Sequence, residues 1–425
     1  MRERVRQLAA FVGWDWADRE HEVRLREAGS DRIEKRKVAG TPVGLHEWAA
    51  EMRSRFQGRP VGVCIETCRG AVIWALMAYD HIVLYPVNPK SAASFRETFY
   101  PSGKKDDPVD SDVLLELIYK HEERLKPLDP ADPATRSLVI LSEHRRKLVH
   151  DVVRTTNRLR ANLKSYFPQA FELVGELDSP MSCEFLKEWP SLTEVKRARP
   201  ATLRKFYHSH GSRSKARIDA RLALLPSAVA LTNDLAVVES GIAVTRSLVR
   251  VITALVESIR EIEAHQQSIY STHPEHDLID SFPGLGPVFG ARIAALLGSD
   301  RDRFASHVEL QLLTGVAPVT KSSGGRKGVI TVHRRLKRSK FLHQTVVEWA
   351  GQSIKNSAWA RAFYNMKRAA GHGRWAALRA LGFKWLRILF RCWKEEIHYD
   401  EATHLKALKE RGSPVVAYFK EEKAA

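Results

Sequence analysis

Two short apolar segments, Phe11-Val-Gly-Trp-Asp15 and Val61-Gly-Val-Cys-Ile-Glu66, decide the fold of the first hundred residues. Each predicts a buried β-strand that ends at a carboxylate. Between them, His21–Leu25 alternates polar and apolar residues, as a half-buried strand does, and residues 33–38 supply a third strand. The two carboxylates are therefore expected at strand ends, where the sites of α/β proteins gather.

Helices are predicted around the second of these segments. Apolar residues recur at helical spacing from Leu45 to Phe56, and Gly58 closes that helix. Residues 70–79 predict another helix, and residues 81–85 predict a further strand. The order strand, strand, strand, helix, strand, helix, strand predicts an α/β domain with a mixed sheet, and ribonuclease-H-like nucleases have this order.

The composition points to a globular, basic protein. The chain has 425 residues, 44% of them hydrophobic, which argues against wholesale disorder and suggests two or three domains. Its 68 Lys and Arg outnumber its 50 Asp and Glu, for a formal net charge of +18. Polyanions are the natural partners of such a chain, although basic proteins that bind no nucleic acid also exist.

Membrane, disulfide and zinc classes are disfavoured. The apolar stretch at 71–87 is interrupted by Asp80 and His81, and no signal-peptide core follows Met1, so a soluble intracellular protein is expected. Four cysteines in a chain this long make no disulfide framework, and no second Cys/His pair follows Cys64 and Cys68 at zinc-finger spacing. Small buried thiols are the expected role.

The middle of the chain is helical and basic. Residues 136–166 predict a helix whose arginines include Arg145, Arg146, Arg158 and Arg160, and this face either is solvated or binds nucleic acid. From Leu231 to Ile259, apolar residues spaced alternately four and three apart predict a coiled-coil seam. The seam can pair with another helix of this chain or with a second copy.

The C-terminal region is mostly helical, with a loosely ordered tail from Arg411. Phe282-Pro-Gly-Leu-Gly-Pro287 before an Ala-rich helix resembles the turn of a helix-hairpin-helix, in which Gly284 and Gly286 would bring amides to a DNA phosphate. Helix packing alone can also explain it. The tryptophans Trp359, Trp375, Trp385 and Trp393 are expected to be core residues beside a basic surface rather than base-stacking residues.

Four acids are candidates for a metal site. Asp15 and Glu66 end strands, and Asp107 and Asp110 are three apart at a predicted helix start. Phosphodiester chemistry uses hard divalent ions, which carboxylates bind. Taken singly, each acid can equally cap a helix or pair with an arginine.

A serine doublet lies in a basic window. Lys321-Ser-Ser-Gly-Gly-Arg-Lys327 predicts a mobile loop, and residues 321–340 contain eight Lys or Arg and no acid. Cations around a serine hydroxyl would stabilise the charge of a phosphoryl-transfer transition state. A Ser-Gly loop is also a common turn. The candidate phosphate-binding residues here are Lys321, Arg326, Lys327, Arg334 and Arg335.

Together these motifs resemble the DEDD transposases of the insertion-sequence-110 family. The resemblance spans roughly residues 9–401. Its motifs, in chain order, are Gly13-Trp-Asp15, Ile65-Glu66, Lys105-Asp-Asp-Pro-Val-Asp110, Asn157-Arg-Leu-Arg-Ala161, Phe282-Pro-Gly-Leu-Gly286, Gly315-Val-Ala-Pro-Val-Thr-Lys-Ser-Ser-Gly324, and Ala377-Leu-Arg-Ala-Leu381 with Trp385 and Trp393.

The resemblance implies an organisation and a set of roles. It implies a RuvC-like, ribonuclease-H-fold domain at 1–135, a basic helix, linker and coiled-coil region at 136–274, a transposase domain at 275–405 and a tail at 406–425. The four acids map onto Asp15, Glu66, Asp107 and Asp110, which would hold Mg²⁺, with Mn²⁺ as an alternative ion. The catalytic serine maps onto Ser323; Ser322 is a rival, and Asp106 leaves a one-residue ambiguity beside Asp107.

On that pattern the chain is an RNA-guided DNA recombinase that excises and inserts its own element. Its implied partners are donor and target DNA, a guide noncoding RNA and further copies of the chain in a dimer or tetramer. The implied location is the cytoplasm of a bacterial or archaeal cell, in association with the nucleoid. One rival is a Holliday-junction resolvase or nuclease that uses only the four carboxylates, with water as nucleophile. Another is a non-catalytic nucleic-acid-binding protein.

Overall fold

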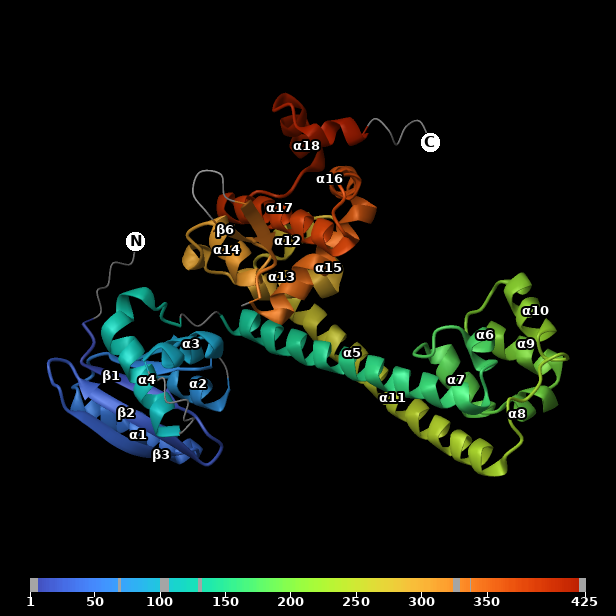
Figure 1. Cartoon of the computed structure of the whole chain (residues 1–425), viewed down its shortest axis with the longest axis horizontal. Coiled ribbons are helices and arrows are strands. Elements are labelled where there is room, and N and C mark those ends of the chain that lie inside the picture. The colour runs from blue at the N-terminus through green and yellow to red at the C-terminus, as the bar shows by residue number, and fades with distance from the viewer. Residues whose placement is uncertain are drawn as a thin grey trace. The chain divides into compact units, whose positions relative to one another are not determined.

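The computed structural model describes residues 7–67, 70–99, 107–128, 132–323, 329–336 and 338–419. The chain divides into two compact units, Met1–Pro130 and Ala131–Ala425 (Figure 1). Each unit has cores of its own, so each is described by itself.

The first unit has the predicted order of strands and helices, followed by two further helices. All seven predicted elements are confirmed within a few residues. The elements are β1 (Ala10–Asp15), β2 (Glu20–Glu27), β3 (Ile33–Ala39), α1 (Pro42–Arg55), β4 (Val61–Ile65), α2 (Ala71–Leu76), β5 (Ile82–Pro86), α3 (Pro89–Phe99), α4 (Asp107–His121) and the 3-10 helix η1 (Glu122–Arg124).

The five strands form one mixed sheet in the order β3-β2-β1-β4-β5. The pairs β1–β2 and β2–β3 are antiparallel, whereas β1–β4 and β4–β5 are parallel. The predicted mixed α/β sheet is therefore confirmed, and its order is compatible with a ribonuclease-H-like domain.

Apolar side chains cover both faces of this sheet. On one face Trp14 is fully buried and meets Trp48 of α1 edge to face, with ring centroids 4.8 Å apart. On the other face Leu114 and Ile118 of α4 pack with Cys64. The sheet is thus enclosed by helices, as a sheet with buried parallel strands requires.

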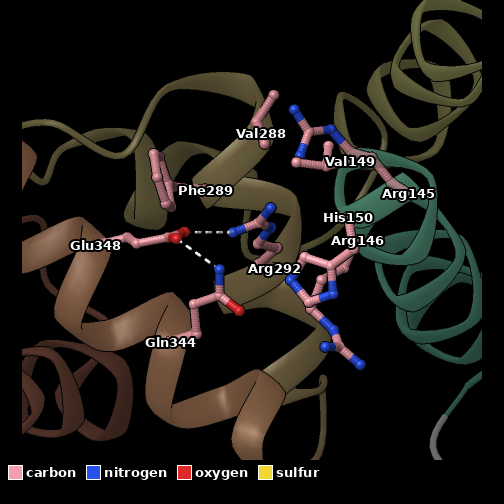
Figure 2. Close-up of a pocket in the computed structure, with 9 residues that line it drawn as sticks. All are labelled: Arg145, Arg146, Val149, His150, Val288, Phe289, Arg292, Gln344 and Glu348. Carbon is pink, nitrogen blue, oxygen red and sulfur yellow. Dashed lines mark hydrogen bonds and ion pairs between the residues drawn. The ribbon is translucent and has the colours of Figure 1, made fainter. Parts of the chain in front are cut away.

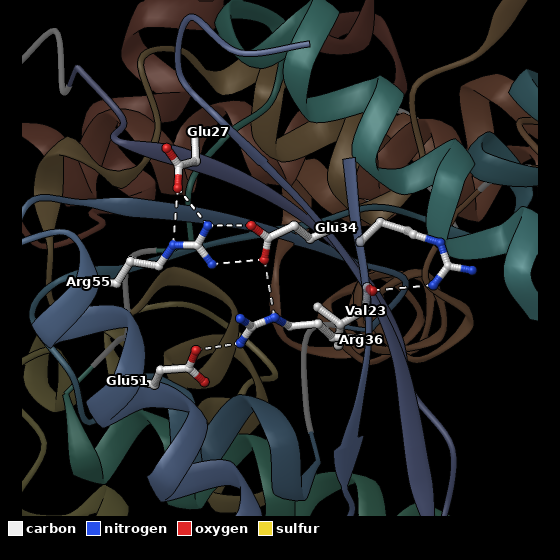
Figure 3. A network of polar contacts seen from close by, with 7 residues as sticks. Val23, Glu27, Glu34, Arg36, Glu51 and Arg55 are labelled. Atoms are coloured by element: carbon white, nitrogen blue, oxygen red, sulfur yellow. Dashed lines mark hydrogen bonds and ion pairs between the residues drawn. The ribbon is translucent and has the colours of Figure 1, made fainter. Parts of the chain in front are cut away.

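Ion pairs connect α1 to strands β2 and β3 (Figure 3). Arg55 of α1 donates from Nη2 to Glu27 Oε1 at 2.6 Å and from Nη1 to Glu34 Oε2 at 2.9 Å. Arg36 of β3 pairs with both Glu34 and Glu51 of α1. The pKa of the Glu34 carboxyl is lowered to about 2, and the largest cause is the hydrogen bond that Arg55 donates to it.

The second unit is almost wholly helical, with one two-stranded hairpin. Its elements are α5 (Pro133–Tyr166), α6 (Ala170–Val174), α7 (Pro180–Glu188), α8 (Leu192–Arg197), α9 (Pro200–Ser209), α10 (Lys215–Ala223), α11 (Leu235–Tyr270), α12 (His276–Asp280), α13 (Gly286–Leu297), η2 (Arg301–Arg303), α14 (His307–Thr314), β6 (Val319–Ser323), β7 (Val329–His333), α15 (Lys340–Asn356), α16 (Ala358–Ala369), α17 (Arg374–Glu395), α18 (Glu401–Glu410) and η3 (Pro414–Phe419).

The predicted heptad seam pairs with a helix of the same chain. The two long helices α5 and α11 pack along each other, and Thr245, Val249 and Ile252 of the seam are buried (Figure 1). Asn162 of α5 donates to the carbonyl of Gly241 at 2.8 Å and to Thr245 Oγ1 at 2.9 Å, which fixes the register of the pair. The seam is shorter than predicted, because Leu231 precedes α11 and is 58% exposed.

The helices of the C-terminal region share one core. Trp359, Trp385 and Trp393 are buried in it, which confirms the expected core role for these three, whereas Trp375 is exposed and stacks with Arg374 instead. The expectation of a loose tail from Arg411 is wrong for Pro414–Phe419, since η3 packs on α16 and buries Val415. Among the described residues, no helix is long and apolar enough to cross a bilayer.

Candidate functional site

Two predicted acids lie at the same edge of the sheet. Trp14 and Ile65 are register partners in the parallel pair β1–β4, and Asp15 and Glu66 each follow one residue later. Adjacent strands lie about 4.8 Å apart, so the two residues are neighbours at the carboxyl ends of their strands. Both side chains are partly exposed. The sheet topology therefore brings together two acids that are 51 positions apart in the sequence.

The helix that carries the other two acids runs antiparallel to β1. Tyr119 of α4 meets Phe11, with ring centroids 5.2 Å apart, and Asp112 accepts a hydrogen bond from Arg24, the register partner of Gly13. Later residues of α4 thus pair with earlier residues of β1. Its first turn, which contains Asp107 and Asp110, lies toward the end of β1 that carries Asp15. We call Asp15, Glu66 and this turn the carboxylate edge.

Gly13 permits this close crossing. A Cβ atom at Gly13 would lie 2.1 Å from the carbonyl oxygen of Ser111 and 2.4 Å from the amide nitrogen of Leu115, both in the backbone of α4. Backbone atoms at such distances cannot move aside without displacing the helix. The glycine in Gly13-Trp-Asp15 therefore sets how closely α4 lies above the strand that ends at Asp15.

The carboxylates differ in what the structure shows of them. Asp110 is largely buried and forms an ion pair with Arg96 of α3. The backbone of Asp107 begins α4, whereas its side chain and the whole of Asp106 lie outside the described residues. Among the described side chains, no group of three or more His, Cys, Asp or Glu is placed to hold a metal ion. By chemistry the oxygen donors fit Mg²⁺, provided that Asp110 exchanges Arg96 for the ion.

Sequence reasoning missed a buried arginine beside this edge. Arg24 is 3% exposed and donates to Glu22 and Asp112, each at 3.1 Å. Glu22 is the register partner of Asp15. The alternation in β2 predicted one solvated face, but α4 covers that face too, and the ion pairs satisfy the buried guanidinium.

Cys64, next to the edge on β4, is buried and unreactive. Burial, followed by the charge of Glu66, raises the pKa of the Cys64 thiol to about 12. Cys183 and Cys392 are also buried, which confirms the expected role, and Cys68 lies outside the described residues.

The predicted serine lies at the end of a β-strand. Lys321, Ser322 and Ser323 belong to β6, which pairs antiparallel with β7, and Ser323 is the register partner of Val329. The expectation that both serines lie in a loop is therefore wrong, because pairing with β7 extends the strand through Ser323. Arg326 and Lys327 lie outside the described residues, as do the side chains of Lys321, Ser322 and Ser323.

Arginines gather at the other end of this hairpin. We call Arg334, Arg335, Arg338 and Arg379 the arginine cluster. Burial, then the charges of Arg334 and Arg338, lowers the pKa of Arg379. The Nε atoms of Arg335 and Arg338 are buried and have no hydrogen-bond partner among the described residues. Within the described residues, the guanidinium groups of the cluster therefore lack enough negatively charged partners.

A half-buried histidine and a large cavity adjoin the cluster. Burial, then the charge of Arg338, lowers the pKa of His343 to about 4. A cavity of about 1220 Å³ extends from Arg334, Arg335 and Arg379 along α17. Its described lining includes eight Lys or Arg and one carboxylate, that of Asp400. Arg379 and His343 escaped the sequence prediction because both lie outside the basic window at 321–340.

The two glycines of the 282–287 motif have different roles. Gly284 has φ +77°, and a Cβ there would lie 2.9 Å from backbone atoms of Gln352 and Ser353 in α15. Trp349 Nε1 also donates to the carbonyl of Pro283 at 3.1 Å. Packing thus explains Gly284. A Cβ at Gly286, the first residue of α13, would meet nothing within 4 Å.

The predicted arginines of α5 also separate into two pairs. Arg145 and Arg146 are half-buried and line a cavity against α13 and α15, and Arg145 pairs with Glu263 of α11. Arg158 and Arg160 are exposed farther along the helix.

Comparison with known proteins gives consistent matches. A family model for the IS110 DEDD transposase, described as a transposase, matches residues 12–168, and the model of the transposase IS116/IS110/IS902 family matches residues 276–365. A Streptomyces coelicolor protein named as a mini-circle transposase for IS117 is 27% identical over 93% of this chain and 96% of its own length. The 42 kDa protein of insertion element IS900 from Mycobacterium paratuberculosis is 25% identical over 92% of this chain and 98% of its own length.

The matched regions contain both candidate regions. Residues 12–168 include the carboxylate edge, and residues 276–365 include the β6–β7 hairpin and three of the four clustered arginines. The 43.6 kDa protein of insertion element IS110 from S. coelicolor is also 26% identical over 71% of this chain. The chain therefore belongs to the IS110 family of transposases.

Proposed function

We propose that this transposase excises and inserts its own element through a divalent metal ion held at the carboxylate edge and a nucleophilic hydroxyl on Ser323. The observation that carries the proposal is the separation of charge within the chain. Carboxylates converge at the ends of β1 and β4, whereas arginines short of anions gather beside the hairpin that carries Ser323. Phosphodiester chemistry needs both kinds of site.

In this proposal Asp15, Glu66, Asp107 and Asp110 hold Mg²⁺ or Mn²⁺. The bound ion would neutralise the scissile phosphate and favour attack by an oxygen nucleophile. Asp110 must leave Arg96 to take part, so Arg96 holds this carboxylate in place until the ion arrives. Arg24 stays with Glu22 and Asp112, and its positive charge limits the repulsion among the acids around it.

Ser323 forms the covalent link to DNA. The hydroxyl of Ser323 loses its proton to solvent as its oxygen forms a bond to phosphorus. The bond from phosphorus to the adjoining nucleotide oxygen breaks, and that oxygen leaves and takes up a proton from solvent. Val319, at the start of β6, pairs with His333, which is next to the arginine cluster. Ser323 is four residues farther along β6, so it lies roughly 13 Å from that end of the hairpin. The arginine cluster therefore holds flanking phosphates, whereas Lys321, Arg326 and Lys327 are the proposed partners of the scissile one.

Guidance by a structured RNA and action as a dimer or tetramer rest on the family resemblance. An RNA from the element's noncoding end would pair with donor and target DNA, and the basic face of α5 with Arg158 and Arg160 is a candidate surface for it. Strand exchange joins two duplexes, which requires more than one copy of the chain.

A recombination assay tests the proposal. Purified protein, flanking noncoding RNA, donor DNA and target DNA are mixed with Mg²⁺, and the junctions are amplified and sequenced. We expect recombinant junctions only with all components present, none with Ser323→Ala, and near-normal yield with Ser322→Ala as the matched control. Normal yield without the RNA would overturn its guiding role, and normal yield from Ser323→Ala would overturn the role of Ser323.

A further inference from the structure

A second arginine site lies between α5 and the helices of the C-terminal region (Figure 2). A cavity of about 320 Å³ is lined by Arg145 and Arg146 of α5, by Phe289 and Arg292 of α13, and by Glu348 of α15. We call it the α5–α13 cavity. No described residue lines both this cavity and the larger cavity beside the arginine cluster.

Arg292 is the buried member of this site. It is 5% exposed, and its guanidinium lies 5.3 Å from the centroid of the Phe289 ring. Nη1 donates to Glu348 Oε2 at 3.0 Å, whereas Nε is buried without a hydrogen-bond partner among the described residues. Burial, then the charge of Arg145, lowers the pKa of Arg292. One carboxylate therefore leaves this guanidinium incompletely satisfied.

The other arginines increase this excess of donors. Arg145 is paired with Glu263, but Arg146 has a buried Nε that finds no partner within the described chain. Glu348, the one acid among the described lining residues, also accepts a hydrogen bond from Gln344 Nε2 at 2.7 Å. Arg292 pairs with Glu348 and Arg145 with Glu263, while the buried Nε atoms of Arg146 and Arg292 keep no partner among the described residues, a balance that favours a bound anion.

The start of α13 adds to the attraction. Val288 and Phe289 belong to the first turn of this helix of 12 residues and line the cavity. Backbone amides and the helix dipole at such an end favour negative charge. Gly286, the first residue of α13, has φ +52°, a backbone conformation that favours glycine.

We propose that the α5–α13 cavity binds a backbone phosphate of a nucleic-acid strand, with Arg292 as its buried donor and Arg145 and Arg146 closing over it. Glu348 occupies Arg292 until the phosphate displaces it. A strand is favoured over free phosphate because Arg160, which is exposed and 14 residues beyond Arg146, lies on nearly the same face of α5, about 40° around the helix and about 21 Å farther along it. The inference rests on the proposed function only in that the chain must bind nucleic acid.

Fluorescence anisotropy with a labelled 20-nucleotide RNA and the matching DNA, both in EDTA, tests this site. We expect Arg292→Gln and Arg146→Gln each to weaken binding about tenfold and to reduce the salt slope by about 1. Glu348→Gln should tighten binding about threefold, because it frees Arg292 from its competitor. The matched control is Arg154→Gln, which removes an exposed, ion-paired arginine of the same helix and should change affinity less than twofold.

The proposal predicts opposite changes in affinity for Arg292→Gln and Glu348→Gln, and this contrast decides the outcome. If both variants weaken binding in step with a lower unfolding temperature, Arg292–Glu348 is a structural ion pair and the proposal fails. Equal losses from Arg154→Gln and Arg146→Gln would also overturn it, by assigning the effect to the charge of α5 as a whole. If Arg292→Gln does not fold, Arg146→Gln and Glu348→Gln still test the site.

The two probes identify the strand. A greater loss on RNA assigns the site to an RNA backbone, and a greater loss on DNA assigns it to DNA; both support a phosphate site. Binding in EDTA is measured without the metal ion that the proposed chemistry requires, so this readout does not depend on that chemistry. Failure of this site and failure of the proposed chemistry are therefore distinguishable.

Discussion

The carboxylate edge and the arginine cluster are built in opposite ways. At the edge, sheet topology aligns Asp15 and Glu66, and a helix crossing over Gly13 directs Asp107 and Asp110 toward the same end. In the cluster, arginines from the end of β7 and from α17 repel one another, and Arg379 has a lowered pKa as a result of burial and of its neighbours.

This difference shows what each region lacks. Like charges that are held together by a fold disfavour the charged state until an opposite charge arrives. At the edge, Arg96 and Arg24 already offset part of the negative charge. In the cluster, two buried Nε atoms have no partner among the described residues. We infer that the edge is poised for a small cation and the cluster for a polyanion.

The largest effect is expected from Asp15→Asn. The substitution keeps the size of the side chain but removes a carboxylate from the edge, so we expect DNA cleavage in Mg²⁺ to fall at least about 100-fold. Cleavage rates on an end-labelled substrate measure this. EDTA should abolish the cleavage by the unchanged chain, and DNA binding by Asp15→Asn should persist. Cleavage at the parental rate would show that the edge is not the metal site.

Gly13→Ala tests the geometry of the edge. The added methyl group would clash with the backbone of α4 at 2.1 Å, so we expect a loss of about 3 kcal/mol in the unfolding free energy of the first unit. Denaturant unfolding measures it. Gly351→Ala in α15 is the matched control, since its Cβ would find nothing nearer than 4.0 Å and should be neutral or slightly stabilising. Equal effects would mean that α4 does not depend on Gly13.

Arg379→Gln tests the cluster. Removing one of several repelling charges should leave the unfolding temperature unchanged or raise it, while DNA affinity falls about tenfold. Anisotropy and thermal unfolding on the same samples measure both. Arg204→Gln removes an arginine that pairs with Asp219, and it should change neither quantity. A loss of stability with normal binding at Arg379 would make the cluster structural.

The smallest expected effects are changes of stability with pH, and the first and second units respond in different pH ranges. Glu34 has its pKa lowered to about 2 from an ordinary 4.5, so its contribution to the first unit is full above pH 4.5 and is lost as the pH falls toward 2. His343 has its pKa lowered to about 4 from 6.5, so the second unit loses stability between pH 6.5 and 4. We expect each effect to be on the order of 1 kcal/mol, after screening of the exposed part of each group.

Unfolding monitored across pH 2–7 with Glu34→Gln and His343→Gln checks these windows. Each variant should flatten the profile only within its own window. A change in the other window would mean that the groups were assigned to the wrong transitions.

Much of the first unit follows from its sequence, because strand periodicity, punctuating glycines and helical spacing agree there. The convergence of Asp15 and Glu66 was predictable from two strands that each end in an acid. The burial of the second face of β2 was not predictable. Alternation within one strand does not show that a distant helix, α4, packs on that strand, and Asp112 of α4, 88 residues after Arg24, pairs with this buried arginine. Only the three-dimensional fold shows that Gly13 permits that arrival.

The second unit was less predictable. The heptad seam predicted a partner helix but could not choose α5 over a second copy. The sequence predicted part of the arginine cluster, because Arg334 and Arg335 lie in a basic window. It did not predict that Arg379 of α17 belongs to the same cluster. Arg292 stands alone among apolar residues in the sequence, so its convergence with Arg146 depends wholly on how α13 packs against α5.

The most direct test of the central claim is a denaturing gel of end-labelled DNA after reaction in Mg²⁺. The account predicts a protein–DNA adduct that survives denaturation, disappears with protease, is absent from Ser323→Ala and Asp15→Asn, and persists in Ser322→Ala. Nicked DNA without an adduct, formed at the parental rate by Ser323→Ala, would contradict the account and identify water as the nucleophile.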